Sequence, residues 1–381
     1  MGNSHNTEKK ELNYPRLIHT ELKNLETLGK DFMKMGFLVS KPASQLAEIV
    51  MLEERPAMIS GCILPGQDIT DTAPKKCQDN YSFVIYQNTL MIMLFDGHGA
   101  NGHFVANFCV DYFTQYYYKH FQDFIYDTQD AIKELFLKCD EDLKSSDINC
   151  DLSGSTCVLA ILTSTHIHCA SVGDSRGILI SSNNGNYFYS NQLTTDQKPN
   201  HKEEYHRIKA QGGCVRRYTN ENGVKRGPYR IWQGDTNIPG LAMSRSLGDF
   251  TGKSIGVIAA PIYACVQLHP RDKYVVIASD GVWDVMSNDH ITDFLSQNFD
   301  KCCGEASQDF PGTVKNCTPA RLICEEARTK WFSVSNIDRN SIDDITCVVL
   351  KVSELNTNEH HRVVQFNCTM VNEEYCLDNF E

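Results

Sequence analysis

Residues 90–103, LMIMLFDGHGANGH, contain six consecutive apolar residues followed by an aspartate, a glycine, a histidine and a second glycine. An apolar run of this length, bounded by turn-forming residues, is typical of a strand that is buried on both faces. The strand ends on two chemically active side chains, Asp96 and His98. The glycines on both sides of His98 permit a sharp turn and let a main-chain carbonyl come close to a ligand. This stretch therefore predicts a buried strand that delivers a carboxylate and an imidazole to a functional site.

Similar apolar runs recur along the chain and predict further strands, at 81–86, 155–162, 166–172, 177–181, 273–279 and 345–352. Helical periodicity covers 103–121, 131–143 and 319–332, another helix is expected after Ser287, and weaker helical patterns occupy 21–38 and 44–54. Strands that come in near-adjacent pairs, with helices between the groups, favour stacked antiparallel or mixed sheets covered by helices.

Composition limits the classes of function. The chain has 381 residues, which allows one large core or two domains, and it carries 48 acidic against 36 basic residues, a net charge of −12. This charge repels nucleic acid, so we predict no nucleic-acid partner. No apolar stretch approaches the roughly 20 residues of a membrane helix, so no transmembrane segment is expected. Sixteen cysteines without a C-x-x-C pair or a signal peptide predict reduced thiols in the cytoplasm or nucleus.

A glycine after the first methionine, Gly2, is the acceptor for N-myristoylation. The motif prefers serine or threonine at the sixth position, whereas this chain has Asn6. An ordinary N-terminal segment is the alternative to acylation. Acylation of Gly2 would allow peripheral association with a membrane. That association would be weak, because a single acyl chain anchors a protein only marginally.

Aspartates stand at the ends of several predicted strands. They are Asp79, Asp96, Asp174, Asp280 and Asp343. A single Asp-Gly pair is usually a turn in which the aspartate caps its own backbone. Five carboxylates gathered at one end of a sheet would instead repel one another unless divalent cations neutralised them. Oxygen ligands favour Mg²⁺ or Mn²⁺, and no set of Cys and His with zinc spacing competes. A calcium loop at 280–291 is excluded because Val285 and Ile291 occupy its glycine and glutamate positions.

Two hard cations held by a shared carboxylate would lower the pKa of bound water and create a nucleophile for attack on phosphorus. His98, two residues from Asp96, could then protonate the leaving alkoxide, since imidazole titrates near neutral pH. A histidine that only satisfies a turn hydrogen bond is the alternative. Kinases and nucleotide-binding proteins are disfavoured because neither G-x-x-x-x-G-K-[ST] nor G-x-G-x-x-G occurs.

Residues 60–352 resemble the metal-dependent serine/threonine protein phosphatases of type 2C, particularly plant and protist members. The resemblance rests on CQDNYSF, LFDGHGANG, SGSTCVLAIL, CASVGDSRG, GLAMSRSLGD, IASDGVWDVMSNDH and DDITCVVL, in the family's order. It implies an α+β fold, a four-layer αββα sandwich of two mostly antiparallel sheets flanked by helices. It also implies hydrolysis of phosphoserine and phosphothreonine by a hydroxide that bridges two Mn²⁺ or Mg²⁺ ions, without a covalent intermediate.

The resemblance assigns roles to residues of this chain. Asp96 would bridge the two metals, and the Gly97 carbonyl would bind one of them. Asp280 and Asp343 would hold the other ion, Asp79 would act through water, and Asp174 would hold a weaker third ion together with Asp280. His98 matches the general acid, whereas Thr156 and Asp249 would shape the site.

Two positions depart from the pattern of the animal enzymes. Gln78 replaces a glutamate, and Lys75 or Lys76 lies near the place of a phosphate-binding arginine. We assign phosphate binding to Lys75, with looser contact because an ammonium lacks the bidentate geometry of arginine.

The resemblance also divides the chain into an N-terminal extension (1–57), a catalytic domain (58–352) with a flap near 200–240, and a C-terminal tail (353–381). We expect a monomer that acts on phosphoproteins. A pseudophosphatase that serves as a regulatory binding module is the alternative function. The filled carboxylate positions favour the enzyme.

Overall fold

The computed structural model of the chain describes residues 37–39, 45–52, 55–68, 75–183, 185, 187–303, 318–335 and 341–352. Gly2 and the tail 353–381 lie outside the described residues, as does the helical pattern before residue 37.

Two antiparallel sheets form the centre of the molecule. The first runs in the order β1 (Phe37–Val39), β5 (Asp79–Tyr86), β6 (Thr89–His98), β8 (Cys157–Leu162), β9 (His166–Val172) and β16 (Ile262–Gln267). The short strands β7 (Gly154–Ser155) and β15 (Leu247–Gly248) extend it at the end of β6. The second sheet has the order β11 (Tyr187–Gln192), β10 (Arg176–Asn183), β17 (Asp272–Ala278), β19 (Ile345–Val352), β3 (Arg55–Leu64) and β2 (Gln45–Leu52).

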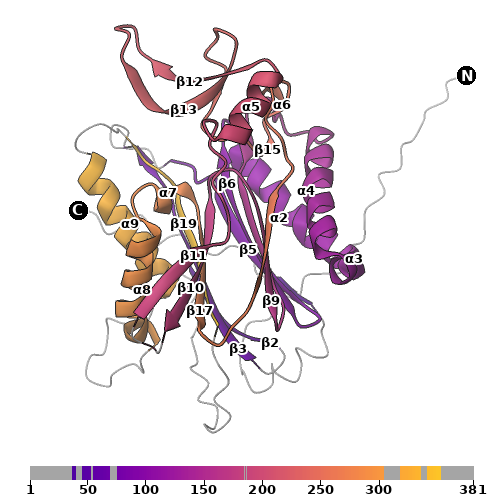
Figure 1. Cartoon of the computed structure of the whole chain (residues 1–381), viewed down its shortest axis with the longest axis vertical. Coiled ribbons are helices and arrows are strands. Elements are labelled where there is room, and N and C mark those ends of the chain that lie inside the picture. Colours follow the sequence, from indigo (N-terminus) through magenta and orange to yellow (C-terminus); the bar gives the residue numbers. More distant parts are fainter. Residues whose placement is uncertain are drawn as a thin grey trace, which may run out of the picture.

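Helices cover the outer faces of both sheets (Figure 1). The first sheet carries α2 (Gly102–Lys119), α3 (Phe121–Tyr126) and α4 (Thr128–Lys144). The second carries α7 (Asp280–Trp283), α8 (Asn288–Cys303) and α9 (Pro319–Ser335). The predicted four-layer αββα sandwich is thereby confirmed. None of the described helices has both the length and the apolar character needed to cross a membrane.

Smaller elements stand at one end of the sandwich. The predicted flap contains α5 (Lys202–Ala210) and a three-stranded sheet of β12 (Gly213–Thr219), β13 (Lys225–Gln233) and β14 (Pro239–Leu241), and α6 (Phe250–Lys253) follows it. The β12–β13 hairpin projects from the body of the molecule in Figure 1. A two-stranded pair, β4 (Gln67–Asp68) and β18 (Ser341–Ile342), lies next to Asp343 and Asp344, just before β19.

The unbroken apolar run of β6 is explained by burial on both faces. Leu90, Ile92 and Leu94 pack between the two sheets, against side chains of β17 and β19. The alternate residues, Met91, Met93 and Phe95, pack under the helices of the first sheet. A strand exposed on one face would instead alternate apolar and polar residues.

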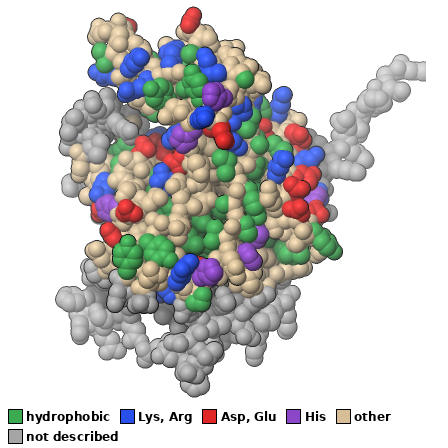
Figure 2. Space-filling model, viewed as in Figure 1, with side chains coloured by type: hydrophobic (Ala, Val, Ile, Leu, Met, Phe, Trp, Pro, Cys, Tyr) green, Lys and Arg blue, Asp and Glu red, His purple; other side chains and the backbone are tan. Residues whose placement is uncertain are grey.

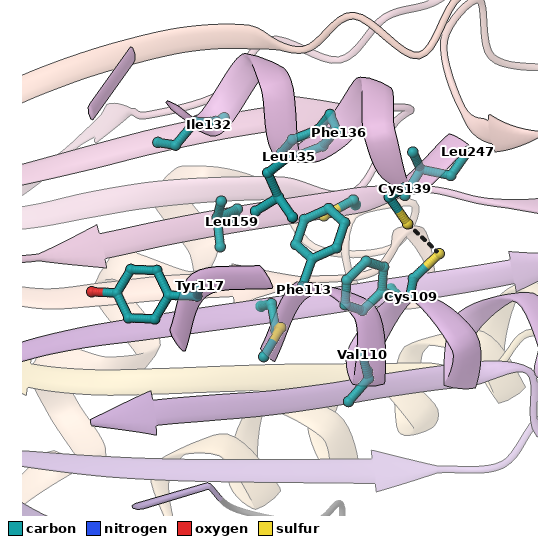
Figure 3. Close-up of a cluster of buried hydrophobic side chains, with 14 of the residues drawn as sticks. Cys109, Val110, Phe113, Tyr117, Ile132, Leu135, Phe136, Cys139, Leu159 and Leu247 are labelled. Atoms are coloured by element: carbon teal, nitrogen blue, oxygen red, sulfur yellow. Dashed lines mark hydrogen bonds between the residues drawn. The ribbon is translucent and has the colours of Figure 1, made fainter. Parts of the chain in front are cut away.

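Aromatic rings fill the layer between the first sheet and its helices (Figure 3). The ring of Phe113 meets Phe95 and Phe136 edge to face, with centroids 5.2 and 5.0 Å apart. The thiols of Cys109 and Cys139 lie 3.7 Å apart beside them and are not joined. Full burial of a side chain such as Phe113 contributes about 1.5–3 kcal/mol, so this layer fixes α2 and α4 on the sheet.

The predicted helix over 44–54 is wrong, because residues 45–52 form strand β2. The strand pairs with β3 along its whole length, from Gln45 opposite Cys62 to Leu52 opposite Arg55. A free sheet edge offers hydrogen bonds to every second residue, and this tertiary pairing overrides a weak local helical pattern. Strands β1 and β2 thus place two parts of the expected N-terminal extension in the central sheets.

Candidate functional site

Asp79 and Asp96 face each other at the same end of the first sheet. They are directly paired residues of the antiparallel strands β5 and β6. Thr156, in the turn between β7 and β8, holds the backbone of Asp96 from the other side. Its amide donates to the Asp96 carbonyl at 2.9 Å, and its Oγ1 accepts from the Asp96 amide at 3.2 Å. The sequence predicted that Thr156 shapes the site, and these two hydrogen bonds hold the backbone of Asp96 in place.

Glycine is required in the turn after Asp96. A Cβ on Gly97 would lie 2.4 Å from the Gly102 carbonyl oxygen and 2.6 Å from that of Gln78. Gly99 has φ +80°, and its Cβ would lie 2.2 Å from the Leu152 carbonyl oxygen. The side-chain amide of Gln78 donates to the Gly99 carbonyl at 2.6 Å. Gln78 therefore braces the turn that presents Asp96 and His98.

The second sheet brings its own carboxylates to the same place. β17 ends at Ala278, and Ser279 Oγ then donates to Asp79 Oδ2 at 2.9 Å. Asp280 opens α7 immediately afterwards. The next residue, Gly281, packs so closely on the Asp344 carbonyl that an added Cβ would lie 1.9 Å from it. The ends of β5, β17 and β19 thus meet.

Asp343 and Asp344 are adjacent in the chain but differ in burial and in their hydrogen-bond partners. The carboxylate of Asp344 is buried and accepts hydrogen bonds from the amides of Gly66 (2.5 Å) and Gln78 (2.8 Å). Asp343 is half exposed, and its Oδ1 contacts Lys75 Nζ at 3.1 Å. Asp344 therefore anchors the turn, and the carboxylate of Asp343 is left to face the site.

Asp96 lies at the centre of an acidic cluster. Burial raises the pKa of its carboxyl well above the ordinary value, and four further carboxylates raise it by repulsion: Asp79, Asp280, Asp343 and Asp174. Burial and the charges of Asp174 and Asp343 likewise raise the pKa of Asp280. Burial and the charge of Asp344 raise the pKa of Asp79 to about 7. The structure thus brings together the five aspartates predicted from the sequence, from five separate segments of the two sheets and their turns.

The donor set fits a hard divalent cation. Asp79 Oδ1 and Asp174 Oδ1 are buried and have no hydrogen-bond partner in the described part of the chain. Such orphaned carboxylate oxygens are costly unless a cation lies beside them. Within the same residues, no three Asp, Glu, His or Cys side chains lie close enough together to enclose one ion by themselves. Mg²⁺ commonly binds through one or two carboxylates and keeps several waters, so an open set of oxygens suits it.

Basic side chains flank the acidic cluster on two sides. Lys75, predicted to bind phosphate, contacts Asp343 and lies 4.0 Å from Asp344 Oδ2. Lys198 forms an ion pair with Asp174, which the sequence did not lead us to expect. The two residues are 24 positions apart, so no short sequence pattern indicates that they pair. Lys198 lies in the segment TTDQKPN, just before the flap.

His98 is hydrogen-bonded to a buried aspartate. Its Nε2 lies 2.7 Å from Asp249 Oδ2, and Asp249 is fully buried. Burial alone would lower the pKa of His98, but the charge and hydrogen bond of Asp249 raise it above the ordinary value. Asp249 has φ +55° in the left-handed region, which a non-glycine residue rarely adopts. The fold therefore holds Asp249 in an unfavourable conformation where it contacts His98.

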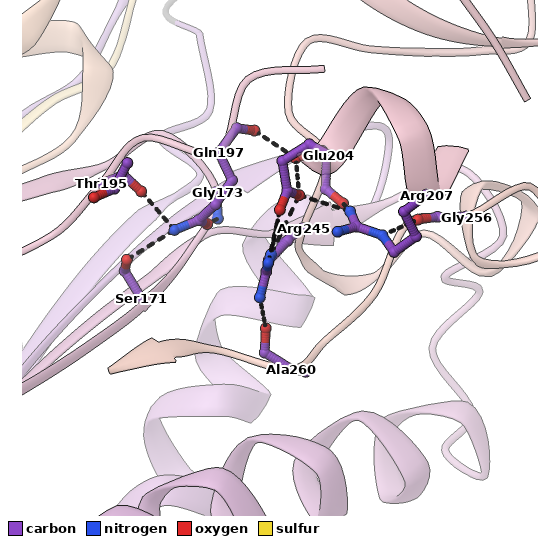
Figure 4. A network of polar contacts seen from close by, with 10 residues as sticks. Ser171, Gly173, Thr195, Gln197, Glu204, Arg207, Arg245, Gly256 and Ala260 are labelled. Atoms are coloured by element: carbon purple, nitrogen blue, oxygen red, sulfur yellow. Dashed lines mark hydrogen bonds and ion pairs between the residues drawn. The ribbon is translucent and has the colours of Figure 1, made fainter. Parts of the chain in front are cut away.

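A polar network joins the flap to the loop that carries Asp174 (Figure 4). Glu204 of α5 accepts from Arg207 and Arg245, each at 2.6 Å. Ser244 Oγ donates to Glu204 at 2.5 Å, and the Ser244 amide donates to the Gln197 carbonyl at 2.8 Å. Gln197 Oε1 in turn accepts from the Gly173 amide at 2.5 Å. Burial alone would raise the pKa of Glu204, but the hydrogen bonds from Arg207, Arg245 and Ser244 together outweigh it and lower the pKa to about 2.

Comparison with known proteins identifies the family. The family description "Protein phosphatase 2C" matches residues 87–310, more than half of the chain. The chain belongs to the protein phosphatase 2C family. This protein phosphatase 2C is 28% identical to probable protein phosphatase 2C 35 of Arabidopsis thaliana, over 84% of this chain and 91% of that protein. It is 30% identical to probable protein phosphatase 2C 72 of the same plant, over 70% and 79% of the two chains.

The same fold occurs in a serine-threonine phosphatase 2C from Toxoplasma gondii. The TM-score is 0.62, at 21% identity, and the match covers 82% of this chain and 100% of that chain. The predictions of a plant- or protist-like phosphatase 2C and of a protein serine/threonine phosphatase are confirmed by these similarities. The pseudophosphatase alternative gains no support from them. The family match includes Asp96, Asp174 and Asp280, whereas Asp79 and Asp343 lie outside its bounds.

Proposed function

We propose that this protein phosphatase 2C hydrolyses phosphoserine and phosphothreonine in proteins at the acidic cluster around Asp96, with two Mg²⁺ or Mn²⁺ ions. The observation that carries the proposal is the convergence on Asp96 of carboxylates from both sheets. These carboxylates raise one another's pKa, and only a cation or a proton could relieve that repulsion.

The proposed ligands come from separate turns. Asp96, with the carbonyl of Gly97, would hold one side of the metal pair, and Asp280 with Asp343 the other. Asp79 would act through water. Asp174 would take a weaker third ion, which would have to replace the ammonium of Lys198. When bound, the ions would activate water for attack on phosphorus and neutralise charge on the phosphate.

The protein's own groups would complete the reaction. His98, held by Asp249, would donate a proton from its imidazolium to the leaving oxygen of serine or threonine. An alkoxide is a poor leaving group at neutral pH, so a proton at this point lowers the barrier. Lys75 would attract the phosphate dianion to the rim of the site. The buried Asp249 keeps the imidazole oriented throughout.

Exchange of Asp96 for asparagine tests the proposal. Asp96→Asn keeps the size of the side chain but removes the shared negative charge, so we expect activity on p-nitrophenyl phosphate and on a phosphothreonine peptide to fall by roughly 10³-fold or more. Asp130→Asn in the exposed first turn of α4 removes one charge from the outer helical layer and serves as the matched control. Wild-type-like activity of Asp96→Asn in Mn²⁺ would overturn the proposal.

A further inference from the structure

The β12–β13 hairpin presents basic side chains on one of its two faces. Paired residues of antiparallel strands lie on the same face, and Cys214 is paired with Trp232, Arg216 with Arg230, and Tyr218 with Arg226. We call the surface formed by Arg216, Tyr218, Arg226 and Arg230 the arginine face. Figure 2 shows basic side chains gathered on the projecting hairpin, above acidic side chains on the body of the molecule.

The opposite face of the hairpin is used for packing. Val215 and Ile231 are paired on that side, and Ile231 is fully buried. They pack in a separate apolar cluster with Ile208, Leu241, Ile255 and Val257. The arginine face is therefore the side of the hairpin that remains free to contact another molecule.

The arginines of the arginine face form no ion pair within the described residues. Arg216 stands directly opposite Arg230, and like charges in this position destabilise a strand pair. Arg216 donates to the Thr236 carbonyl at 2.9 Å and lies 4.7 Å from the Trp232 ring centroid. Arg230 donates to the Gly240 carbonyl at 2.6 Å. Among the described residues, no carboxylate forms an ion pair with Arg216, Arg226 or Arg230, so their charges are available to an anionic ligand.

One end of the arginine face adjoins the candidate site. Arg230 is partly buried, and the charge of Asp174 acts on its guanidinium. Arg226 lies four residues further along β13, with a register shift between them. The irregularity places Arg230 and Arg226 opposite Arg216 and Tyr218, which are two residues apart on β12, so the two arginines lie roughly 7 Å apart along the hairpin, about two residues of an extended peptide. The cationic surface thus begins at the acidic cluster and continues outward.

We propose that the arginine face binds acidic residues that lie within a few positions of the phosphorylated residue in the substrate. The proposal rests on the phosphatase function above. It adds that the preferred substrates have an acidic sequence around the phosphorylated residue. The chain as a whole is acidic, with a net charge of −12, and would repel such substrates. A cationic surface next to the site would therefore both attract acidic phosphoproteins and orient them.

Two phosphothreonine peptides test this proposal, one with aspartates and one with asparagines at the four positions on each side of the phosphothreonine. For the wild type at low salt we expect kcat/KM to be about tenfold higher for the acidic peptide, since each exposed charge contact contributes a factor of a few. In Arg216→Glu/Arg226→Glu the ratio should fall to about one or below. It should also fall in the wild type at high salt.

Lys133→Glu/Lys138→Glu on the exposed side of α4 makes the same two charge reversals away from the hairpin and should keep the tenfold ratio. If the double variant does not fold, Arg226→Glu alone should fold, because the Arg226 side chain is exposed and forms no ion pair within the described residues. It should give a smaller loss, since it reverses only one charge. Fluorescence anisotropy with labelled peptides measures binding independently of turnover. Weaker binding of the acidic peptide by the variant supports the proposal even if the proposed reaction were wrong.

Three results would overturn the proposal while leaving the phosphatase function intact. The first is hydrolysis of both peptides by the wild type at equal kcat/KM. The second is an acidic preference that the double variant retains. The third is binding of single-stranded RNA by the wild type without any discrimination between the two peptides. Failure of the wild type to hydrolyse either peptide in Mn²⁺, with discrimination retained in binding, would instead contradict the phosphatase function alone.

Discussion

The pair formed by His98 and Asp249 shows how a single residue's chemistry depends on a distant part of the chain. The two residues are 151 positions apart, yet their side chains lie 2.7 Å apart. The carboxylate favours the protonated imidazole, which is the form that a proton donor requires. Asp249 does not face the phosphate in the proposed reaction, so we regard it as a positioning residue.

Asp249→Asn should lower the pKa of His98, because it keeps a hydrogen-bonding group but removes the negative charge. A group that acts in its protonated form loses activity as the pH rises through its pKa. The alkaline limb of the pH profile of kcat should therefore move to lower pH, most visibly with phenyl phosphate, whose leaving group is poor. His98→Ala should slow phenyl phosphate by roughly 10²-fold and p-nitrophenyl phosphate much less.

The exposed pair His120 and Asp123, with its 3.2 Å contact, provides the matched control for this experiment. Asp123→Asn should leave the pH profile in place. Equal slowing of both substrates by His98→Ala, or an unmoved alkaline limb in Asp249→Asn, would show that His98 is not the proton donor.

Helix α5 connects the flap to the catalytic end of the sheets through Glu204. Its carboxylate is buried and bonded to two guanidinium groups, which explains a folded-state pKa of about 2. The ordinary pKa of a glutamate is about 4.3, so this group contributes stability at higher pH. That contribution is complete above the unfolded pKa and is lost as the pH falls through about 2.

Glu204→Gln should remove this pH dependence and destabilise the fold by about 2 kcal/mol at neutral pH, since two partly buried guanidinium groups lose their counter-charge. Thermal unfolding measured between pH 7 and pH 3 checks the expectation. The wild type should lose more stability than the variant as the pH falls. Glu203→Gln, the exposed neighbour in the same helix turn, should follow the wild type, and identical slopes for Glu204→Gln and the wild type would contradict the assignment.

Elements differ in how far the sequence predicts them. Strands buried on both faces, such as β6 and β19, were predicted because their apolar runs have no other explanation. Strand β2 was not predicted from the sequence, because Gln45–Leu52 forms a strand through pairing with the edge of β3. The five aspartates were found through their positions at strand ends. The partners of two site residues, Lys198 with Asp174 and Asp249 with His98, depend on long-range packing and left no periodic signal.

At the scale of the whole molecule, the proposed metal ligands belong to both sheets. Asp79 and Asp96 come from the first sheet, whereas Asp280 and Asp343 flank strands of the second. Without cations their mutual repulsion acts to separate the two halves of the sandwich. Bound cations would attract the carboxylates of both sheets and would therefore hold the two halves together.

Metal removal should therefore lower the melting temperature as well as the activity. A hundredfold excess of Mg²⁺ or Mn²⁺ over its dissociation constant should stabilise the fold by about 2.7 kcal/mol, which corresponds to several degrees for a chain of this size. Calorimetry in EDTA and in MnCl₂ measures the shift. The shift should be much smaller in Asp280→Asn, and a shift of wild-type size in that variant would argue against metal binding at this site.

The apolar layer between the sheets has a further consequence for the distances within the site. Side chains such as Ile92 and Val348 set the gap between the sheets, and the acidic turns are rigidly attached to the strands that bear them. A methylene group added or removed in this layer would move the two groups of ligands apart or together by a fraction of an ångström. Cation preference in this enzyme can therefore change through hydrocarbon substitutions in the interior, at positions that neither an ion nor a phosphoprotein ever touches.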